Sequence, residues 1–293
     1  MSGTLDLAAA QAHVVEVVTR SGSSFSLGMK VLPAERRLAQ FAVYAFCREV
    51  DDVADEGGTT EEKLAELERW REEVHRLYDG RPTRPTAVAL LEPVRRFRLP
   101  REEFLALIDG MEMDARESMR APDMATLRLY CRRVAGTAGL LSLPVFGAAE
   151  PEARDFALAL GDALQLTNIL RDIAEDAERQ RLYLPRELLE QHGIDPSRPL
   201  AEVLRHPGLA KVFDDLARLA RRRYAEADAA LIHCNRKPLR PALLMMGIYE
   251  AILDHLERTG WNPDAPPARL SKPAKLWAAL TRGLLRPKWR PST

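Results

Sequence analysis

The sequence predicts an all-α protein, because its apolar residues follow the period of a helix and not that of a strand. Apolar side chains recur three or four positions apart over long stretches, for example at Leu38, Phe41 and Ala45 and again at Phe156, Leu160 and Leu164. Segments that alternate every second residue and are rich in Val, Ile and Thr are nearly absent. The 293 residues, 46% of them apolar, suffice for one large helical unit with a buried core.

Breaks rich in glycine and proline separate the predicted helices, and none of them is long enough to be an interdomain linker. They fall at residues 56–60, 80–85, 99–100, 121–123, 147–151, 193–199 and 236–241. No repeat of fixed period is present. We therefore expect one helical domain over residues 10–260, followed by a tail over residues 261–293.

Charge and cysteine content argue against several classes of protein. The 43 basic residues are balanced by 43 acidic ones, so we expect no nucleic-acid partner. The three cysteines are far apart and form no CxxC pair, which argues against a disulfide framework and a cysteine-based zinc site. The longest uncharged run, residues 134–149, is too short for a membrane span, and the N-terminus lacks the pattern of a secretory signal. These features predict a cytoplasmic protein.

The first informative segment is the predicted helix over residues 35–56. One of its faces, defined by spacings of four, three and four, carries Tyr44, Arg48, Asp51 and Asp55. The adjacent row carries Asp52 and Glu56, so four carboxylates crowd one helix end. Taken alone, this cluster is typical of an acidic helix end in water.

A second helix, predicted over residues 160–185, repeats the arrangement. Its polar stripe, with spacings of three, four and four, consists of Gln165, Asn168, Asp172 and Asp176. The stripe has too many apolar neighbours to lie fully in water, so its polar groups need partners. Oxygen ligands from two facing helices suit Mg²⁺, which completes its shell with water and phosphate oxygens. We interpret the two stripes together as a site for a metal-bound diphosphate.

Arginines accompany both stripes and admit two interpretations. Arg48 precedes the first cluster, and Arg171, Arg179 and Arg181 surround the second. Guanidinium groups bind phosphate oxygens through paired hydrogen bonds. The alternative is that each arginine neutralises the neighbouring carboxylates as a structural ion pair.

A third predicted helix, over residues 130–141, contains Gly136 and Gly139 three positions apart. These small residues either admit a neighbouring helix or line a tunnel for a long hydrocarbon chain. Ser24 has the plain role of a helix N-cap. The sequence contains no HExxH, GxSxG, GxGxxG or P-loop motif, so hydrolase and nucleotide-binding interpretations lack support.

At these residues the sequence resembles the squalene and phytoene synthase family. The matching runs are SSFSLGMKVLPAERR, YAFCREVDDVADE, YCRRVAGTAGLLSLPVFG and QLTNILRDIAEDAERQRLYLP, which occur in the family's order over about residues 20–250. The resemblance implies an isoprenoid-synthase helical fold with a central apolar cavity. Together with GMEMD at residues 110–114, it is nearest to the bacterial presqualene diphosphate synthases of that family.

The resemblance also implies roles for individual residues. The metal ligands would be Asp51, Asp55, Asp172 and Asp176. Asp52 and Glu56 would surround these ligands without binding the metal themselves. Contacts with diphosphate or metal would come from Ser24, Arg48, Gln165, Asn168, Arg171 and Arg181. The tyrosines near the reacting carbons would be Tyr44, Tyr130 and Tyr183, and Tyr249 is a looser match among the substrate-binding residues. Leu27 departs from the family, where an aromatic residue is frequent.

The activity implied by the resemblance is the condensation of two farnesyl diphosphates to presqualene diphosphate, with release of diphosphate, in hopanoid and squalene biosynthesis. It requires Mg²⁺ and no NADPH. Two alternatives within the family are a phytoene synthase, which acts on geranylgeranyl diphosphate, and an NADPH-dependent squalene synthase. An alternative of another class is a non-catalytic helical binding protein whose acidic stripes are structural.

The tail has a composition of its own. Residues 261–293 hold seven basic residues and one acid. Leu276, Leu280 and Leu284 recur every four positions beside Trp277, flanked by lysines and arginines. This pattern predicts an interfacial amphipathic helix on an anionic membrane, so the protein could be peripheral to the inner face of a membrane. A disordered basic tail is the alternative.

Overall fold

The structure is a computed structural model that describes residues 6–116, 119–263, 267–268 and 270–285. It consists of helices and their connections. No strand occurs among those residues, which confirms the predicted all-α class. The first half contains α1 (Leu7–Ser21), α2 (Phe25–Met29), α3 (Ala34–Asp55), α4 (Thr60–Tyr78), α5 (Pro85–Phe97), α6 (Arg101–Ala115), α7 (Met124–Cys131), a π-helical turn η1 (Arg132–Gly136) and α8 (Thr137–Phe146). The second half contains α9 (Pro151–Arg171), α10 (Ile173–Glu178), α11 (Arg186–Gln191), α12 (Leu200–Leu204), α13 (Leu209–Leu231), α14 (Arg240–Thr259), α15 (Lys272–Ala278) and a second π-helical turn, η2 (Ala279–Leu284).

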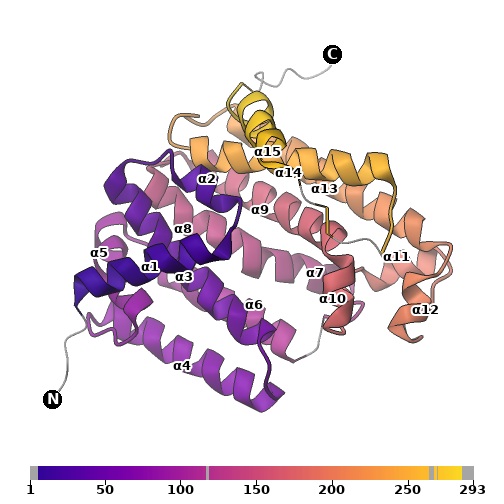
Figure 1. Cartoon of the computed structure of the whole chain (residues 1–293), viewed down its shortest axis with the longest axis horizontal. Coiled ribbons are helices and arrows are strands. Elements are labelled where there is room, and N and C mark those ends of the chain that lie inside the picture. Colours follow the sequence, from indigo (N-terminus) through magenta and orange to yellow (C-terminus); the bar gives the residue numbers. More distant parts are fainter. Residues whose placement is uncertain (1–5, 117–118, 264–266, 269, 286–293) are drawn as a thin grey trace.

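The buried apolar residues form two cores, one mainly from N-terminal and one mainly from C-terminal helices. Figure 1 shows these two groups of helices side by side. The first core is formed mainly by α1 and α3–α6, with Phe46 and Phe104 fully buried at its centre. The second is formed mainly by α7, α9, α11, α13 and α14, around Phe156 and Phe213. Helix α8 contributes side chains to both cores. A cavity at the boundary between the cores leaves the packing within each core intact.

The acidic end of α3 is fixed by a turn with clear helix-stop and helix-start signals. Glu56 leaves the helix with an extended backbone, and Gly58 follows at φ +133°. A capping box then begins α4: Thr59 Oγ1 accepts from the Glu62 amide (3.2 Å), and the Glu62 carboxylate accepts from the Thr59 amide (2.8 Å). The carboxylates predicted at this end of α3 are therefore held at a defined position.

The helix predicted over residues 160–185 is not continuous. It ends at Arg171, and Asp172 leaves helical geometry (φ −101°, ψ 11°) before α10 begins. The Arg171 guanidinium binds the Asp172 carboxylate with both Nε (2.7 Å) and Nη2 (2.6 Å). Adjacent side chains do not face each other on a helix, so this pair requires a break there. The prediction of one long helix was wrong for this reason, although Asp172 and Asp176 still lie on the same cavity.

Small residues bring α8 and η1 onto α9. A Cβ atom added to Gly139 would lie 3.2 Å from the Ala157 carbonyl oxygen, and one added to Gly161 would lie 3.1 Å from the Ala135 carbonyl oxygen. These distances are too short for a larger side chain. Of the predicted notch, Gly139 admits α9 and also lines the cavity, whereas Gly136 packs against the side chains of Arg132 and Leu158 and does not line it.

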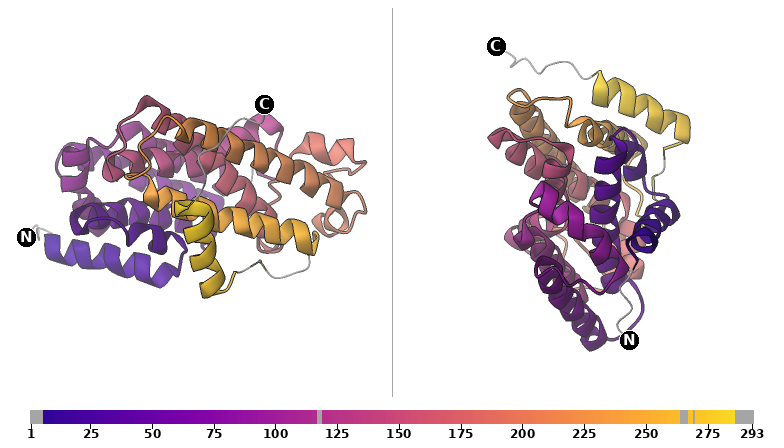
Figure 2. Two further views of the ribbon diagram at one scale, coloured as in Figure 1. Left: turned by 90° about the horizontal axis from the view of Figure 1, so that it is seen from above. Right: turned by 90° about the vertical axis from the view of Figure 1, so that its left-hand side faces the viewer.

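The described part of the tail packs on α14, and Figure 2 shows α15 on the outside of the molecule, crossing that helix. A Cβ atom added to Gly247 of α14 would lie 2.6 Å from the Ala278 carbonyl oxygen. The predicted helix around Leu276–Leu284 thus forms, as α15 and η2. The other charged tail positions, Asp264, Arg269, Arg286, Lys288 and Arg290, lie outside the described residues.

Candidate active site

A cavity of about 640 Å³ lies between the two cores. Its wall comes from α2, α3, α6, α7, η1, α8, α9, α10 and α14, together with the segment after α10. The cavity has a polar end, where α3 stops and α9 meets α10, and an apolar interior. It therefore suits a molecule with a charged head and a long hydrocarbon chain.

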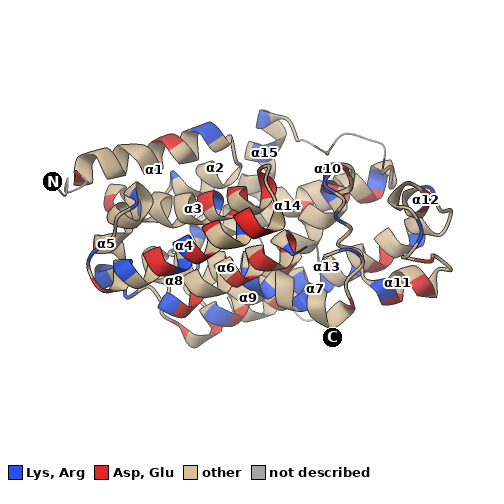
Figure 3. Ribbon diagram, turned by 90° about the horizontal axis from the view of Figure 1, so that it is seen from below, with Lys and Arg blue, Asp and Glu red and all other residues tan. Residues whose placement is uncertain are grey.

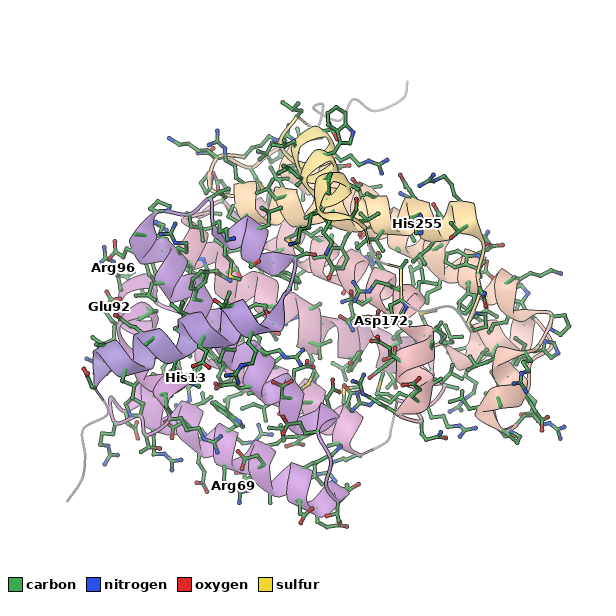
Figure 4. All side chains as sticks on the ribbon, in the orientation of Figure 1. His13, Arg69, Glu92, Arg96, Asp172 and His255 are labelled. Atoms are coloured by element: carbon green, nitrogen blue, oxygen red, sulfur yellow. The ribbon has the colours of Figure 1, made fainter. Side chains whose placement is uncertain are left out.

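The polar end brings together the carboxylates of the two predicted stripes. Asp51 and Asp55 reach it from α3, and Asp172 and Asp176 reach it from the α9–α10 junction. Asp172 is labelled in Figure 4, where it lies beside α10 in the interior of the molecule. The amides of the second stripe, Gln165 and Asn168, line the same end. Residues separated by more than a hundred positions in sequence thus share one wall.

Three arginines at this end bind acidic side chains. Arg181 donates from Nη1 to Asp55 (2.6 Å) and from Nη2 to the Ala54 carbonyl oxygen (2.9 Å), which ties the segment after α10 to the end of α3. Arg171 holds Asp172 through two hydrogen bonds, and Arg48 pairs with Asp52 at 2.5 Å. For Arg48, Arg171 and Arg181 the structural ion pairs considered above are therefore formed. The same guanidinium groups line the cavity, where they face any bound anion.

The carboxylates remain under-neutralised despite these arginines. Burial, and after it the charge of Asp55, raises the pKa of Asp51 to about 7. Burial, and after it the charge of Asp172, raises the pKa of Asp176 to about 8. In both cases burial and a neighbouring carboxylate disfavour the charged form.

Two tyrosines and a third acidic group form a buried cluster in the cavity wall. The rings of Tyr130 and Tyr183 are stacked, with centroids 5.1 Å apart and planes at 24°. The Tyr183 hydroxyl donates to Oδ1 of Asp114 (2.7 Å), and the Tyr130 hydroxyl donates to Oδ2 (2.8 Å). Burial is the main cause that raises the pKa of Asp114 above its usual range.

The interior of the cavity is lined by apolar side chains that include Met29, Val43, Leu107, Met111, Leu143, Phe146, Phe156, Leu160 and Leu164. One polar pair interrupts this lining, because Gln40 Nε2 donates to Ser142 Oγ at 2.9 Å. Tyr44 stands at the boundary with the polar end, its ring centroid 6.3 Å from that of Phe25. A lining of this kind excludes water from a bound hydrocarbon chain.

Four of the predicted site residues do not line the cavity. Ser24 occupies the N-cap position of α2 without a capping bond, and the neighbouring Ser23 lines the cavity and accepts from the Phe25 amide (3.2 Å). Tyr249 is buried behind the wall, with the Arg171 guanidinium carbon 5.8 Å from its ring centre. It can act on a ligand only through that arginine.

Asp52 and Glu56 also lie away from the cavity, in a second depression on the outer side of α3. Glu49 lines the same depression and binds His13 of α1, a residue that Figure 4 labels, at 2.6 Å. Asp52 and Glu56 therefore point to a different side of α3 from Asp51 and Asp55. This separation follows from helical geometry, since neighbouring positions differ by about 100° around the axis.

The sequence analysis missed Asp114 and Glu175, which also line the polar end. Asp114 follows Leu107 and Met111 by seven and three positions, so the three share one face of α6. An acid in line with these apolar positions was the available signal. Glu175 offered none, because it lies in the short α10 that the sequence did not separate from α9.

The donor set fits a divalent cation that shares its shell with a ligand. Within the described ranges, no three His, Cys, Asp or Glu side chains converge closely enough to hold a metal by themselves. The donors are instead two carboxylate pairs on either side of one cavity, with amide oxygens beside them. Mg²⁺ is bound in this way by few carboxylates, completed by waters and phosphate oxygens. The raised pKa values of Asp51 and Asp176 also fit a site whose charge balance includes cations.

Comparison with known proteins gives consistent matches. The sequence profile described as squalene/phytoene synthase matches residues 18–274. A presqualene diphosphate synthase of Sinorhizobium fredii is 45% identical over 92% of this chain and 95% of its own. The enzyme of the same name from Zymomonas mobilis is 46% identical over 88% of each chain. A chloroplastic phytoene synthase 2 of Solanum lycopersicum is 35% identical over 93% of this chain and 90% of its own.

Solved structures agree with these matches. A dehydrosqualene synthase superposes with a TM-score of 0.83 at 25% identity, over 95% of this chain and 97% of that chain. A squalene synthase from Alicyclobacillus acidocaldarius superposes with a TM-score of 0.76 at 30% identity, over 88% and 96%.

Proposed function

The chain belongs to the squalene/phytoene synthase family, and we propose that it condenses two molecules of farnesyl diphosphate head to head into presqualene diphosphate. It is a prenyltransferase whose substrate is a prenyl diphosphate. The observation that carries the proposal is the polarity of the cavity, which has carboxylates and arginines at one end and apolar side chains in the interior. The two relatives named presqualene diphosphate synthase are 45% and 46% identical, against 35% for the phytoene synthase, which favours this product over phytoene.

The family uses divalent metal ions, and we propose Mg²⁺ held by Asp51, Asp55, Asp172 and Asp176. Bound there, the metal would supply Lewis-acid stabilisation of the departing diphosphate. The reaction needs no NADPH, because its product retains one diphosphate and no carbon is reduced.

The arginines would bind the diphosphates. Arg171 and Arg181 present guanidinium groups that bind carboxylates in the free protein and can turn to phosphate oxygens. Tyr249 would keep Arg171 oriented, since its ring lies against that guanidinium. The amides of Gln165 and Asn168 add neutral polar groups at the same end.

The apolar interior would protect the reactive intermediate. Loss of diphosphate from one substrate breaks its C1–O bond and leaves an allylic cation. The 2,3 double bond of the second substrate attacks that C1, and loss of a proton closes the cyclopropane ring. Water would divert the cation to an alcohol, so the apolar lining must exclude it, and the ring faces of Tyr44 and Tyr130 can stabilise the positive charge.

The test is mass spectrometry of the products formed from farnesyl diphosphate and Mg²⁺, with and without NADPH. We expect presqualene diphosphate and no dependence on NADPH. Squalene that increases with NADPH would assign the two-step reaction instead. A preference for geranylgeranyl diphosphate with a phytoene-type product would overturn the proposed substrate, and absence of any diphosphate release would favour a binding protein.

We also propose that α15 contacts an anionic membrane. Leu276 and Trp277 of α15 are exposed, as is Leu280 in the following turn η2, and Trp277 is 71% exposed. In Figure 3 the helix carries basic positions and no acidic ones, which agrees with its sequence KPAKLWA. An apolar face with flanking lysines is typical of a helix that lies in the membrane interface. No described helix is both long and apolar enough to cross a bilayer.

A further inference from the structure

Asp114 is a buried acid at the centre of the cavity wall for which the family resemblance supplied no role. It lies near the end of α6, its side chain is 6% exposed, and it lines the cavity. Both of its oxygens are engaged, one by the hydroxyl of Tyr130 and the other by that of Tyr183. The two hydroxyl oxygens are 3.4 Å apart. A single carboxylate therefore determines where both phenol groups lie.

The nearest basic side chain does not bind Asp114. Arg181 lowers its pKa by charge alone, while the Arg181 guanidinium is bound to Asp55 and the Ala54 carbonyl oxygen. Burial nevertheless raises the pKa of Asp114 above its usual range. A carboxylate in such a place is held mainly by its two phenol donors, and these hydrogen bonds are of the strong, charge-assisted kind.

The geometry of the two rings follows from this bond pattern. Tyr130 comes from α7, immediately before the π-helical turn, and Tyr183 comes from the segment after α10. Without a common acceptor the two elements would not fix the rings at a 5.1 Å separation and 24° interplanar angle. Donation of each hydroxyl to a carboxylate also increases the electron density of its ring, which strengthens attraction to a cation.

We propose that Asp114 is a positioning residue that holds Tyr130 and Tyr183 as one stacked pair, and that this pair keeps the allylic cation on the path to carbon–carbon coupling. The inference rests on the proposed function, since it concerns the fate of that cation. Asp114 acts through the tyrosines and needs no contact with the substrate. Its loss leaves diphosphate binding intact and lets the cation be captured by water.

The first test is the ratio of coupled product to prenyl alcohol in Asp114→Asn. Asparagine is uncharged and presents one acceptor oxygen and one donor nitrogen, so one of the two hydroxyls can no longer donate to it and neither bond is charge-assisted. We expect the ratio to fall about tenfold, with a lower kcat and a KM within about threefold of wild type. The control is Glu103→Gln on the same helix, which removes an equally buried carboxylate bound to Arg132 away from the cavity. It should lower the melting temperature and leave the ratio unchanged.

A second test separates positioning from direct action. In the double variant Tyr130→Phe with Tyr183→Phe, Asp114 has no hydroxyl to hold. Adding Asp114→Asn there should leave the product ratio unchanged, because the two changes act through the same pair. A further loss in that background would overturn the inference, as would an unchanged ratio in Asp114→Asn alone.

The ratio does not depend on which coupled product forms. If the wild-type enzyme makes a coupled product other than presqualene diphosphate, the proposed function is wrong, yet the same comparison of variants still decides the role of Asp114. If wild type makes presqualene diphosphate and Asp114→Asn keeps the ratio, only the inference is wrong. The two failures are therefore distinguishable.

Discussion

Asp51 and Asp172 reach one cavity from different helices, and each shares it with a second acidic group. We expect Asp51→Asn and Asp172→Asn each to lower turnover at least about a hundredfold, equivalent to about 3 kcal/mol, because each removes a proposed metal ligand. The melting temperature should stay unchanged or rise in Asp51→Asn, because burial disfavours the charged carboxylate. Steady-state kinetics and thermal unfolding measure the two quantities.

The matched control for these variants is Glu49→Gln. Glu49 also lies on α3, but it faces α1 and binds His13. The turnover of the Glu49→Gln variant should remain close to that of wild type. Turnover near wild type in Asp51→Asn or Asp172→Asn would contradict the proposed metal site.

At the residue scale, the sequence could place most of the candidate site. Helical spacing alone put Asp51 and Asp55 on one face, and the structure has both at the polar end of the cavity. Spacing could not decide between Ser23 and Ser24, because the chain there turns between two short elements. Asp114 was missed because its partners are tyrosines that only the folded chain brings near.

At the element scale, Glu73 holds the start of α5 against α4. Its side chain is 1% exposed and accepts from the Thr83 hydroxyl (2.7 Å), the Arg84 amide (2.8 Å) and Arg76 Nε (2.8 Å). Glu73→Gln should lower the free energy of unfolding by about 3 kcal/mol, because an amide donates where a carboxylate accepts. The neighbouring Glu72→Gln, at an exposed ion pair, should change it by less than about 0.5 kcal/mol.

The same residue predicts a pH dependence. Burial tends to raise the pKa of Glu73, but the hydrogen bonds from Thr83, Arg84 and Arg76 outweigh it and lower that pKa overall. A lowered pKa in the folded state gives stability that is present above the unfolded value of about 4.3 and is lost as the pH falls. The difference between wild type and Glu73→Gln in urea unfolding should therefore be constant above about pH 5 and shrink below about pH 4. A difference that grows on acidification would contradict this account.

The exposed face of α15 makes a prediction of its own. Trp277→Ala with Leu280→Ala should weaken binding to anionic vesicles at least about tenfold, since it removes the apolar side chains that would enter the interface. Co-sedimentation with phosphatidylglycerol-containing vesicles measures this. Ile232→Ala is the control, because Ile232 is an exposed apolar residue just beyond α13. Equal binding by wild type and the double variant would rule out the proposed contact.

The elements show why sequence patterns locate helices better than they locate breaks within helices. The Gly57-Gly58 pair and the capping threonine Thr59 mark the end of α3 and the start of α4. The break at Asp172 carries no glycine or proline, and it depends on an ion pair between adjacent side chains. The π-helical turn at Arg132–Gly136 likewise has no local sequence signal, because it reflects packing against α9.

At the scale of the whole molecule, the polar end joins two halves that have separate cores. Asp51 and Asp55 belong to the N-terminal half, and Asp172 and Asp176 belong to the C-terminal half. A ligand that engages both pairs would couple the unfolding of the halves. The all-α class followed from the apolar period, but this division did not, because no linker separates the halves in sequence.

This arrangement predicts a synergy in thermal unfolding. Mg²⁺ together with inorganic diphosphate should raise the melting temperature by about 5 °C or more, and each alone should raise it much less. The reason is that metal and diphosphate each complete the binding site of the other between the two halves. In Asp172→Asn the combined effect should be largely lost. Additive shifts in wild type would contradict a shared site.

The ion pairs of the free cavity have a further consequence for how a charged ligand is recognised. When a metal diphosphate binds as proposed, the carboxylates of Asp55 and Asp172 exchange arginine for metal, and Arg181 and Arg171 exchange carboxylate for phosphate. The two ion pairs would be replaced by four, two between carboxylate and metal and two between arginine and phosphate. Because the metal offsets the charge of the diphosphate, the enclosed charge would change little, so few ions would leave the surrounding solution. The affinity of the site for a metal diphosphate should consequently vary weakly with ionic strength, unlike the affinity of an exposed arginine cluster for an anion. The site then selects ligands that carry both positive and negative charge.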